Sequence, residues 1–133
     1  MDNILLCGVV YSVVILFLVI CAQSMSGVMN NGMKWGFGAR DTANDLTTFQ
    51  ARALRTVNNH IESMLLFVPL ALVAFHLDLG DHDLVKKGVW LYLIGRAIYP
   101  ITYWTGLPYA RTLIWAVSIL GIVLVFLPVM GWA

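Results

Sequence analysis

The stretch RALRTVNNHIESMLLFVPLALVAF, residues 52–75, decides the fold. Its second half is apolar enough for a membrane-spanning helix, whereas its first half carries arginines, asparagines, a histidine and a glutamate. A helical span needs roughly 20 residues. The stretch reaches that length only if both halves belong to one helix. We therefore expect a transmembrane helix that carries polar side chains inside it.

The composition of the whole chain also indicates a membrane protein. Of its 133 residues, 60% are hydrophobic and 11% are charged, and the mean hydropathy is +0.83. An ordinary soluble domain is about a quarter charged. The net charge of +1 offers no basic surface of the kind that nucleic acid requires, so nucleic acid is not an expected partner.

Apolar stretches predict four helices, at residues 4–22, 61–77, 89–104 and 113–133. The first and last stretches are long enough to span a membrane by themselves. The middle two reach that length only if the polar residues next to them belong to the same helices. We expect one all-α domain over residues 1–133, an integral membrane four-helix bundle. The first stretch has no basic residue before its long apolar run, so we expect a mature helix and not a signal peptide. Cys7 and Cys21 would lie about 21 Å apart along it and cannot pair.

The loops between the helices are expected at residues 26–45, 78–88 and 105–111. The basic residues near the first and third loops outnumber Lys86 and Lys87 near the second; they are Lys34, Arg40, Arg52, Arg55 and Arg111. The positive-inside rule then predicts that the first and third loops are cytoplasmic and that both termini lie outside.

Polar residues follow one face of the second helix and one face of the third. At about 100° per residue, one stripe spans roughly 80° and contains Arg52, Arg55, Asn59 and Glu62. Asn58 and His60 fall outside that arc, on opposite sides. The other stripe spans about 60° and contains Tyr92, Arg96, Tyr99 and Tyr103. An ionisable group at membrane depth costs from about 2.5 kcal/mol upward, so we expect the stripes to face each other or to share a ligand.

The charges in these helices leave two interpretations open. An ion pair between Glu62 and Arg96 would fix helix packing. The arginines of the stripes and Arg111 nevertheless outnumber Glu62, so the surplus positive charge requires an anion. A lipid headgroup, the carboxylate of an acyl chain, or a small anionic cofactor that also offers an amine to Glu62 would each serve. For Tyr99 and Tyr103, a tyrosine belt at the membrane interface is the alternative to a binding role.

Three motifs in order resemble the MAPEG family, the membrane-associated proteins in eicosanoid and glutathione metabolism. They are Arg55-x3-Asn59-x2-Glu62, Arg96-x2-Tyr99-x3-Tyr103, and Arg111 at the start of the last helix. The segments GARD (38–41) and GLPYARTLIW (106–115) resemble the versions common in bacterial members. The motifs span about half of the chain, and the four-helix plan spans all of it.

The resemblance implies a homotrimer in the bacterial inner membrane that holds glutathione in clefts between subunits near the cytoplasmic side. It implies that Arg111 stabilises the glutathione thiolate. The residues it implies for cofactor binding are Arg55, Asn59, Glu62, Tyr99, Tyr103 and Arg96. A basic residue at the end of the first helix or in its loop also contacts glutathione in the family, and Lys34 and Arg40 are both candidates.

These residue types suit glutathione, which carries two carboxylates and one ammonium at neutral pH. Arginine binds carboxylates through a bidentate fork, and Glu62 can meet the ammonium. A free thiol is only a few per cent thiolate at pH 7, and a guanidinium beside the sulfur raises that fraction. We therefore expect a glutathione transferase with peroxidase as a side activity. It would act in detoxification, on lipophilic electrophiles or lipid hydroperoxides dissolved among membrane lipids.

Other classes of function fit the sequence less well. A non-catalytic lipid-binding or scaffolding relative would keep the fold without turnover, and loss of the thiol-activating arginine would favour it. A transporter or channel subunit would predict polar residues along whole spans, which the first and fourth helices lack. His60, His76 and His82 show no metal-binding spacing, so no metal site is expected.

Overall fold

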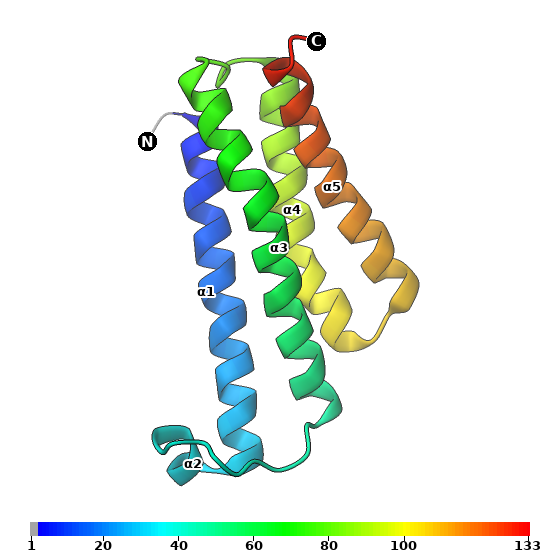
Figure 1. Cartoon of the computed structure of the whole chain (residues 1–133). Helices are drawn as coiled ribbons and strands as arrows, with labels where there is room; N and C mark the ends of the chain where they lie inside the picture. Colours follow the sequence, from blue (N-terminus) through cyan, green and yellow to red (C-terminus); the bar gives the residue numbers. More distant parts are fainter. Residues whose placement is uncertain (1–2) are drawn as a thin grey trace.

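The computed structural model describes residues 3–133, and they form an all-α bundle without strands (Figure 1). The helices are α1 (Ile4–Asn31), α2 (Met33–Phe37), α3 (Thr48–His76), α4 (Asp83–Thr105) and α5 (Pro108–Val129). The four long helices run side by side, and the short α2 lies beyond the lower end of α1 in Figure 1. The all-α prediction is confirmed, and α3 contains both the polar and the apolar half of the stretch 52–75.

The prediction that residues 26–45 form a loop is wrong over much of that range. Helix α1 continues to Asn31 because nothing in residues 26–31 breaks it. The helix ends at Gly32, whose φ of +88° only glycine adopts readily. Helix α2 then follows at once. Gly27, within the expected loop, packs against the ring of Trp35 from α2.

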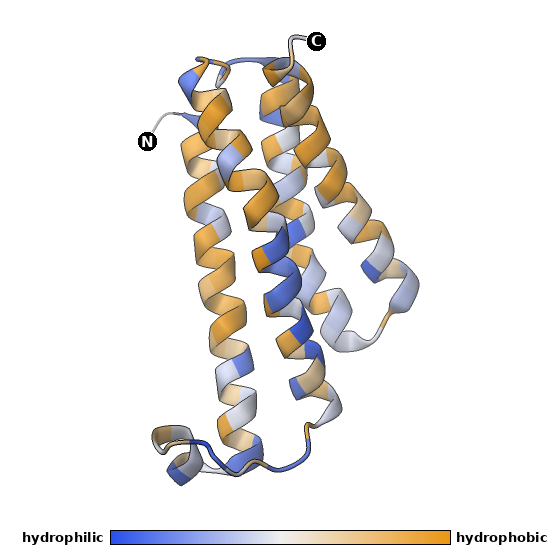
Figure 2. Ribbon diagram, viewed as in Figure 1, coloured by the Kyte–Doolittle hydropathy of each residue, from blue (hydrophilic) through white to orange (hydrophobic). Residues whose placement is uncertain are grey.

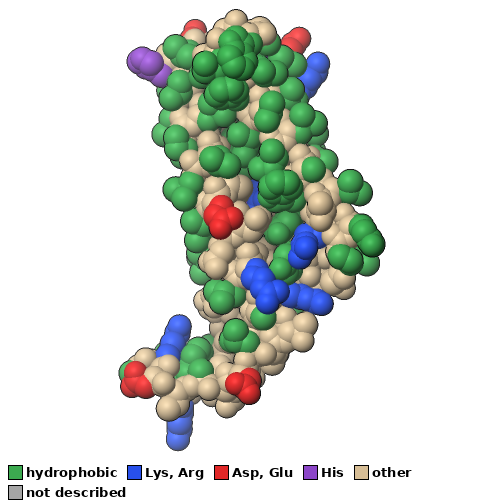
Figure 3. Space-filling view, turned by 45° about the vertical axis from the view of Figure 1, so that its right-hand side comes forward, with side chains coloured by type: hydrophobic (Ala, Val, Ile, Leu, Met, Phe, Trp, Pro, Cys, Tyr) green, Lys and Arg blue, Asp and Glu red, His purple; other side chains and the backbone are tan. Residues whose placement is uncertain are grey.

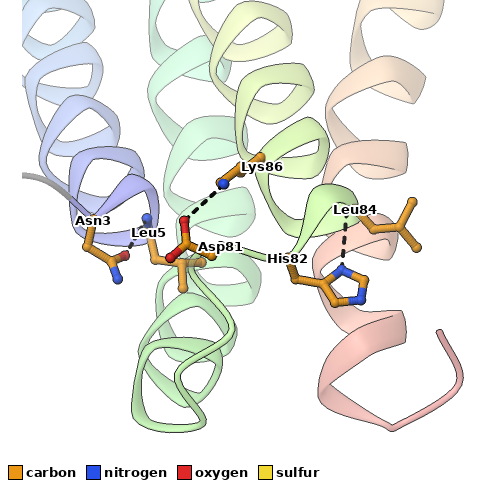
Figure 4. Close-up of polar contacts among 6 residues, drawn as sticks. All are labelled: Asn3, Leu5, Asp81, His82, Leu84 and Lys86. Atoms are coloured by element: carbon orange, nitrogen blue, oxygen red, sulfur yellow. Dashed lines mark hydrogen bonds and ion pairs between the residues drawn. The ribbon is translucent and has the colours of Figure 1, made fainter.

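The other two expected loops are shorter than predicted. Helix α4 begins at Asp83 because His82 caps it, its ring Nδ1 accepting from the Leu84 N–H at 3.3 Å (Figure 4). Lys86 of the first turn forms an ion pair with Asp81 at 2.9 Å (Figure 4). Helix α5 begins at Pro108, where the absence of a proline N–H costs nothing in a first turn.

The connections alternate between the two ends of the bundle. The α3–α4 connection lies at the same end as the start of α1, where the Asn3 side chain accepts from the Leu5 N–H at 2.9 Å (Figures 1 and 4). The C-terminus lies there too, and the α1–α3 and α4–α5 connections lie at the opposite end. Cytoplasmic placement of that opposite end stays a prediction.

Three helices, α1, α3 and α5, are long and apolar enough to cross a membrane. Their outer faces carry large exposed hydrophobic side chains, such as Phe17 and Leu65. Apolar colour dominates most of α1, the upper half of α3 and the upper part of α5, whereas the lower half of α3 is strongly polar (Figure 2). Helix α4 is more polar because it contains Asp83, Lys86, Lys87 and Arg96. Its 23 residues would still extend about 35 Å, enough for the hydrocarbon core. A fourth crossing by α4 stays a prediction.

Small residues let α4 and α5 approach closely. A Cβ atom at Gly121 would lie 2.6 Å from the Gly88 carbonyl oxygen and 2.5 Å from the Tyr92 nitrogen. Both obstacles are backbone atoms, which cannot turn aside. Tyr92 in turn stacks on Phe67 of α3, with ring centroids 3.9 Å apart. The glycine contact therefore helps to place α4 between α5 and α3.

We predict that Gly121→Ala lowers the thermal unfolding midpoint in detergent, at a cost of about 1–3 kcal/mol, because α5 must move away from α4. Circular dichroism during heating measures the midpoint. Ala116→Val, on the exposed side of α5, is the control and should leave it nearly unchanged. Equal midpoints for wild type and Gly121→Ala would contradict this account of the helix contact.

Candidate functional site

A pocket of about 420 Å³ opens on the side of the bundle where α3 faces α4 and α5. Figure 3 shows basic and acidic side chains gathered around this face within a mainly hydrophobic surface. The lining residues are Arg55, Asn58, Asn59, Glu62, Tyr99, Tyr103, Arg111, Thr112 and Trp115. The structure thus brings together six of the residues that the sequence singled out, from three helices.

Helical spacing explains how each helix presents its part of the lining. Residues three or four apart share a helix face, as Arg55, Asn59 and Glu62 do on α3. Asn58 was expected outside this face, but it lies one turn from both Arg55 and Glu62 and joins the lining. The sequence reasoning also missed Thr112 and Trp115. Trp115 lies four residues after Arg111 and so shares its helix face, which was a signal, whereas the spacing of Thr112 gave none.

Aromatic rings link the arginines at the two ends of the site. The Arg96 guanidinium carbon lies 4.8 Å from the centre of the Tyr99 ring, and that of Arg111 lies 4.8 Å from the centre of the Tyr103 ring. The two rings are 5.7 Å apart. A guanidinium over an aromatic face gains a cation–π attraction. Tyr103 therefore positions Arg111 at the start of α5, beside the pocket.

Arg96 lies behind the pocket wall and is only 1% exposed. Its Nε donates to His60 Nδ1 at 3.2 Å, and its Nη2 donates to Asn59 Oδ1 at 2.9 Å. The direct ion pair between Arg96 and Glu62, one of the two interpretations, is not formed. Arg96 is held by neutral acceptors and an aromatic face, so its positive charge is not cancelled by a carboxylate.

Glu62 is exposed, and its carboxylate makes no hydrogen bond or ion pair with any residue from 3 to 133. It lines the same pocket as Arg55 and Arg111, whose guanidinium groups have no carboxylate partner in the described chain. The pocket therefore presents cations and an acid side by side, each able to bind a group on a ligand.

Arg52, expected in the polar stripe, caps the end of α4. Its Nη1 donates to the Trp104 carbonyl oxygen at 3.1 Å, and its guanidinium lies against Gly106, where φ is +81°. A cation at a helix C-terminus also interacts favourably with the helix dipole. A smaller cavity of about 220 Å³ there shares Arg55, Tyr103 and Arg111 with the main pocket. Arg52 thus holds the connection that carries Arg111.

Lys34 and Arg40 lie away from this pocket. They line a separate cavity of about 530 Å³ beside α2. Arg40 donates to the Gly36 carbonyl oxygen at 3.1 Å, and its guanidinium carbon lies 5.1 Å from the centre of the Trp35 ring. A single chain therefore does not bring these two cations to the residues of α3, α4 and α5, and their role stays a prediction.

The apolar outer faces, the membrane-length helices and the charged pocket define a helical membrane protein with a polar pocket on its side. The model of the MAPEG family matches residues 8–130, and the chain belongs to this family. Its members include glutathione transferases, glutathione peroxidases and leukotriene and prostaglandin synthases. Comparison with curated proteins and with solved structures gave no match. The predicted family is confirmed.

We predict that Arg52→Met loosens the α4–α5 connection by removing the cap on α4. The Gly106 and Leu107 N–H groups donate to the last turn of α4. Hydrogen exchange at these two N–H groups should become about tenfold faster, because the lost hydrogen bond lowers the free energy of local opening by about 1 kcal/mol. Mass-spectrometric exchange of the peptide covering residues 102–108 measures it. Lys87→Met, an exposed cation at the other end, is the control; unchanged exchange in Arg52→Met would contradict the capping role.

Proposed function

We propose that the protein binds glutathione in the pocket between α3, α4 and α5 and uses its thiol to conjugate lipophilic electrophiles or reduce lipid hydroperoxides. The feature that carries the proposal is the convergence of Arg55, Glu62, Tyr99 and Arg111 on one pocket in a chain of the MAPEG family. We further propose a homotrimer in the bacterial inner membrane, with the first and third loops in the cytoplasm.

The charges of the pocket fit those of glutathione. Its two carboxylates require cations, and Arg55 lines the pocket without a carboxylate partner in the described chain. Its ammonium requires an acid, and Glu62 is the only acidic residue of the lining. Bidentate contacts between arginine and carboxylate are strong and directional. These residues would bind and orient the tripeptide while contributing no nucleophile themselves.

Arg111 is the residue we assign to activating the thiol. The ring of Tyr103 positions its guanidinium beside the pocket. A fixed cation near the sulfur favours the thiolate, which is the reactive form. The hydroxyl groups of Tyr99 and Tyr103 make no hydrogen bond with residues 3–133, so both can donate to a ligand.

The surroundings of the pocket support a lipophilic second substrate. Leu65 and Leu113, on the helices that form the pocket, are 69% and 67% exposed. Trp115, also exposed, forms part of the lining itself. Exposed apolar side chains on these helices would face hydrocarbon in a membrane, so an electrophile dissolved in the bilayer would reach the sulfur laterally without crossing water.

A trimer would account for two further observations. The pocket is open, with Arg55 and Glu62 exposed, so a neighbouring protomer would cover it. Lys34 and Arg40 lie outside the pocket of their own chain, and an adjacent subunit would bring one of them to it. We therefore place the glutathione site between subunits and keep both cations as candidate contacts.

A non-catalytic lipid-binding relative is the second candidate function. The unpaired arginines of the pocket, on helices with exposed apolar side chains, would also suit a lipid headgroup with its acyl chains. Loss of the thiol-activating arginine would favour this relative, and the presence of Arg111 beside the pocket therefore favours the enzyme.

We predict that titrating glutathione into the detergent-solubilised wild type produces a saturable ultraviolet thiolate band near pH 7. Arg111→Ala should lose most of this band, because the neutral thiol then dominates as it does in water. Absorbance difference spectra measure the band, and calorimetry reports binding separately.

Lys87→Ala, which removes an exposed cation at the opposite end, is the matched control and should retain the band. Absence of both band and binding in the wild type would refute the enzyme proposal and favour the lipid-binding one. A full thiolate band in Arg111→Ala would move thiol activation to another residue.

We also predict that Glu62→Gln weakens glutathione binding at least about tenfold, the value of a hydrogen bond to a charged group. The same variant should bind glutathione acetylated on its amino nitrogen as well as the wild type does, because that ligand has no ammonium. Calorimetry with both ligands checks this. An equal loss for both ligands would show that Glu62 does not meet the ammonium.

A further inference from the structure

A chain of buried polar contacts connects α1, α3 and α4 directly behind the pocket wall. His60 of α3 and Ser12 of α1 are almost wholly buried, and His60 Nε2 lies 2.9 Å from the Ser12 carbonyl oxygen. On the other side, Arg96 of α4 donates through Nε to His60 Nδ1 and through Nη2 to Asn59 Oδ1. Of these residues only Asn59 lines the pocket.

The chemistry of the partners fixes the direction of every hydrogen bond. Arginine has only donors, so His60 Nδ1 must accept and carries no proton. The proton of the neutral ring is then on Nε2, where it points to the Ser12 carbonyl oxygen, which can only accept. Both ring nitrogens are thus satisfied, and His60 holds Arg96 in place.

The same reasoning fixes the amide of Asn59. The atom that accepts from Arg96 must be Oδ1, so the amide cannot turn over without losing this bond. Its nitrogen makes no hydrogen bond with residues 3–133 and is not buried. Asn59 therefore offers the pocket a donor, which suits a carboxylate or amide carbonyl oxygen of a ligand.

We propose that His60 is a positioning residue of the glutathione site. It acts through Arg96 to hold the Asn59 amide with its nitrogen toward the pocket. The proposal rests on the proposed function, because glutathione is the ligand that the Asn59 donor would bind. It assigns Arg96, expected from the sequence to contact the cofactor, to supporting Asn59 from behind.

The proposal predicts that His60 and Asn59 act as one unit in binding. His60→Leu fills the space of the ring but leaves Arg96 Nε without its acceptor, and Asn59→Ala removes the donor that Asn59 offers to the pocket. Each should raise the Kd for glutathione about tenfold. The double variant should be no weaker than Asn59→Ala alone, since the effect of His60 passes through Asn59. His60→Asn places an oxygen near the position of Nδ1 and should restore most of the affinity.

Calorimetric titration of glutathione into the full-length detergent-solubilised protein and these four variants measures the cycle. Unchanged affinity in His60→Leu, or losses that add in the double variant, would overturn the positioning role. The thiolate band of His60→Leu at saturating glutathione should match the wild type, because Arg111 is untouched. A lost band would show general damage to the site and would also count against the proposal.

A second variant covers the case in which His60→Leu does not fold. Arg96→Lys replaces the planar fork, whose Nε and Nη2 bond to His60 and Asn59 separately, with a single nitrogen on a flexible stem. It should weaken binding in the wild-type background while having no effect in Asn59→Ala. Effects of equal size in the two backgrounds would contradict the proposal. Wild-type protein that binds no glutathione would refute the proposed function and this inference together, whereas wild-type binding with an additive cycle would refute only the inference.

Discussion

A buried arginine at the centre of the bundle is the constraint on which the site depends. Burial of the Arg96 guanidinium in an apolar bundle requires polar partners. His60 accepts from its Nε, Asn59 accepts from its Nη2 and the ring of Tyr99 lies against it, while the buried Nη1 makes no hydrogen bond with residues 3–133. These contacts orient α3 and α4 so that their polar stripes lie together, and the pocket forms where α5 completes the third side.

Placing neutral acceptors around Arg96 has a consequence for the pocket. If Glu62 had paired with Arg96, its carboxylate would be buried behind the pocket. Arg55 and Arg111 would then have no acidic neighbour in the pocket lining. Glu62 instead stays exposed beside Arg55. Arg96 is therefore buried behind the pocket, whereas Arg55, Arg111 and Glu62 line it. A pocket with both cations and an acid suits a ligand that carries both signs of charge.

The sequence predicted the helices more successfully than the loops. Apolar stretches of membrane length mark a helix whatever surrounds it, so all four long helices were found. The ends of helices depend on single local contacts, such as the His82 cap or the positive φ of Gly32, and composition does not reveal them. Helix α2 was missed because glycines on either side of its five residues resemble a loop.

By itself, the sequence determined the all-α membrane class, the family and the faces on which the polar residues lie, because helical periodicity and motif spacing are properties of one segment. Only the tertiary structure decided which polar groups meet. It placed Arg96 against His60 and not against Glu62, assigned Arg52 to the end of α4, and left Lys34 and Arg40 at a different cavity. The physical reason is that these contacts join separate helices, and their distances depend on how the helices pack.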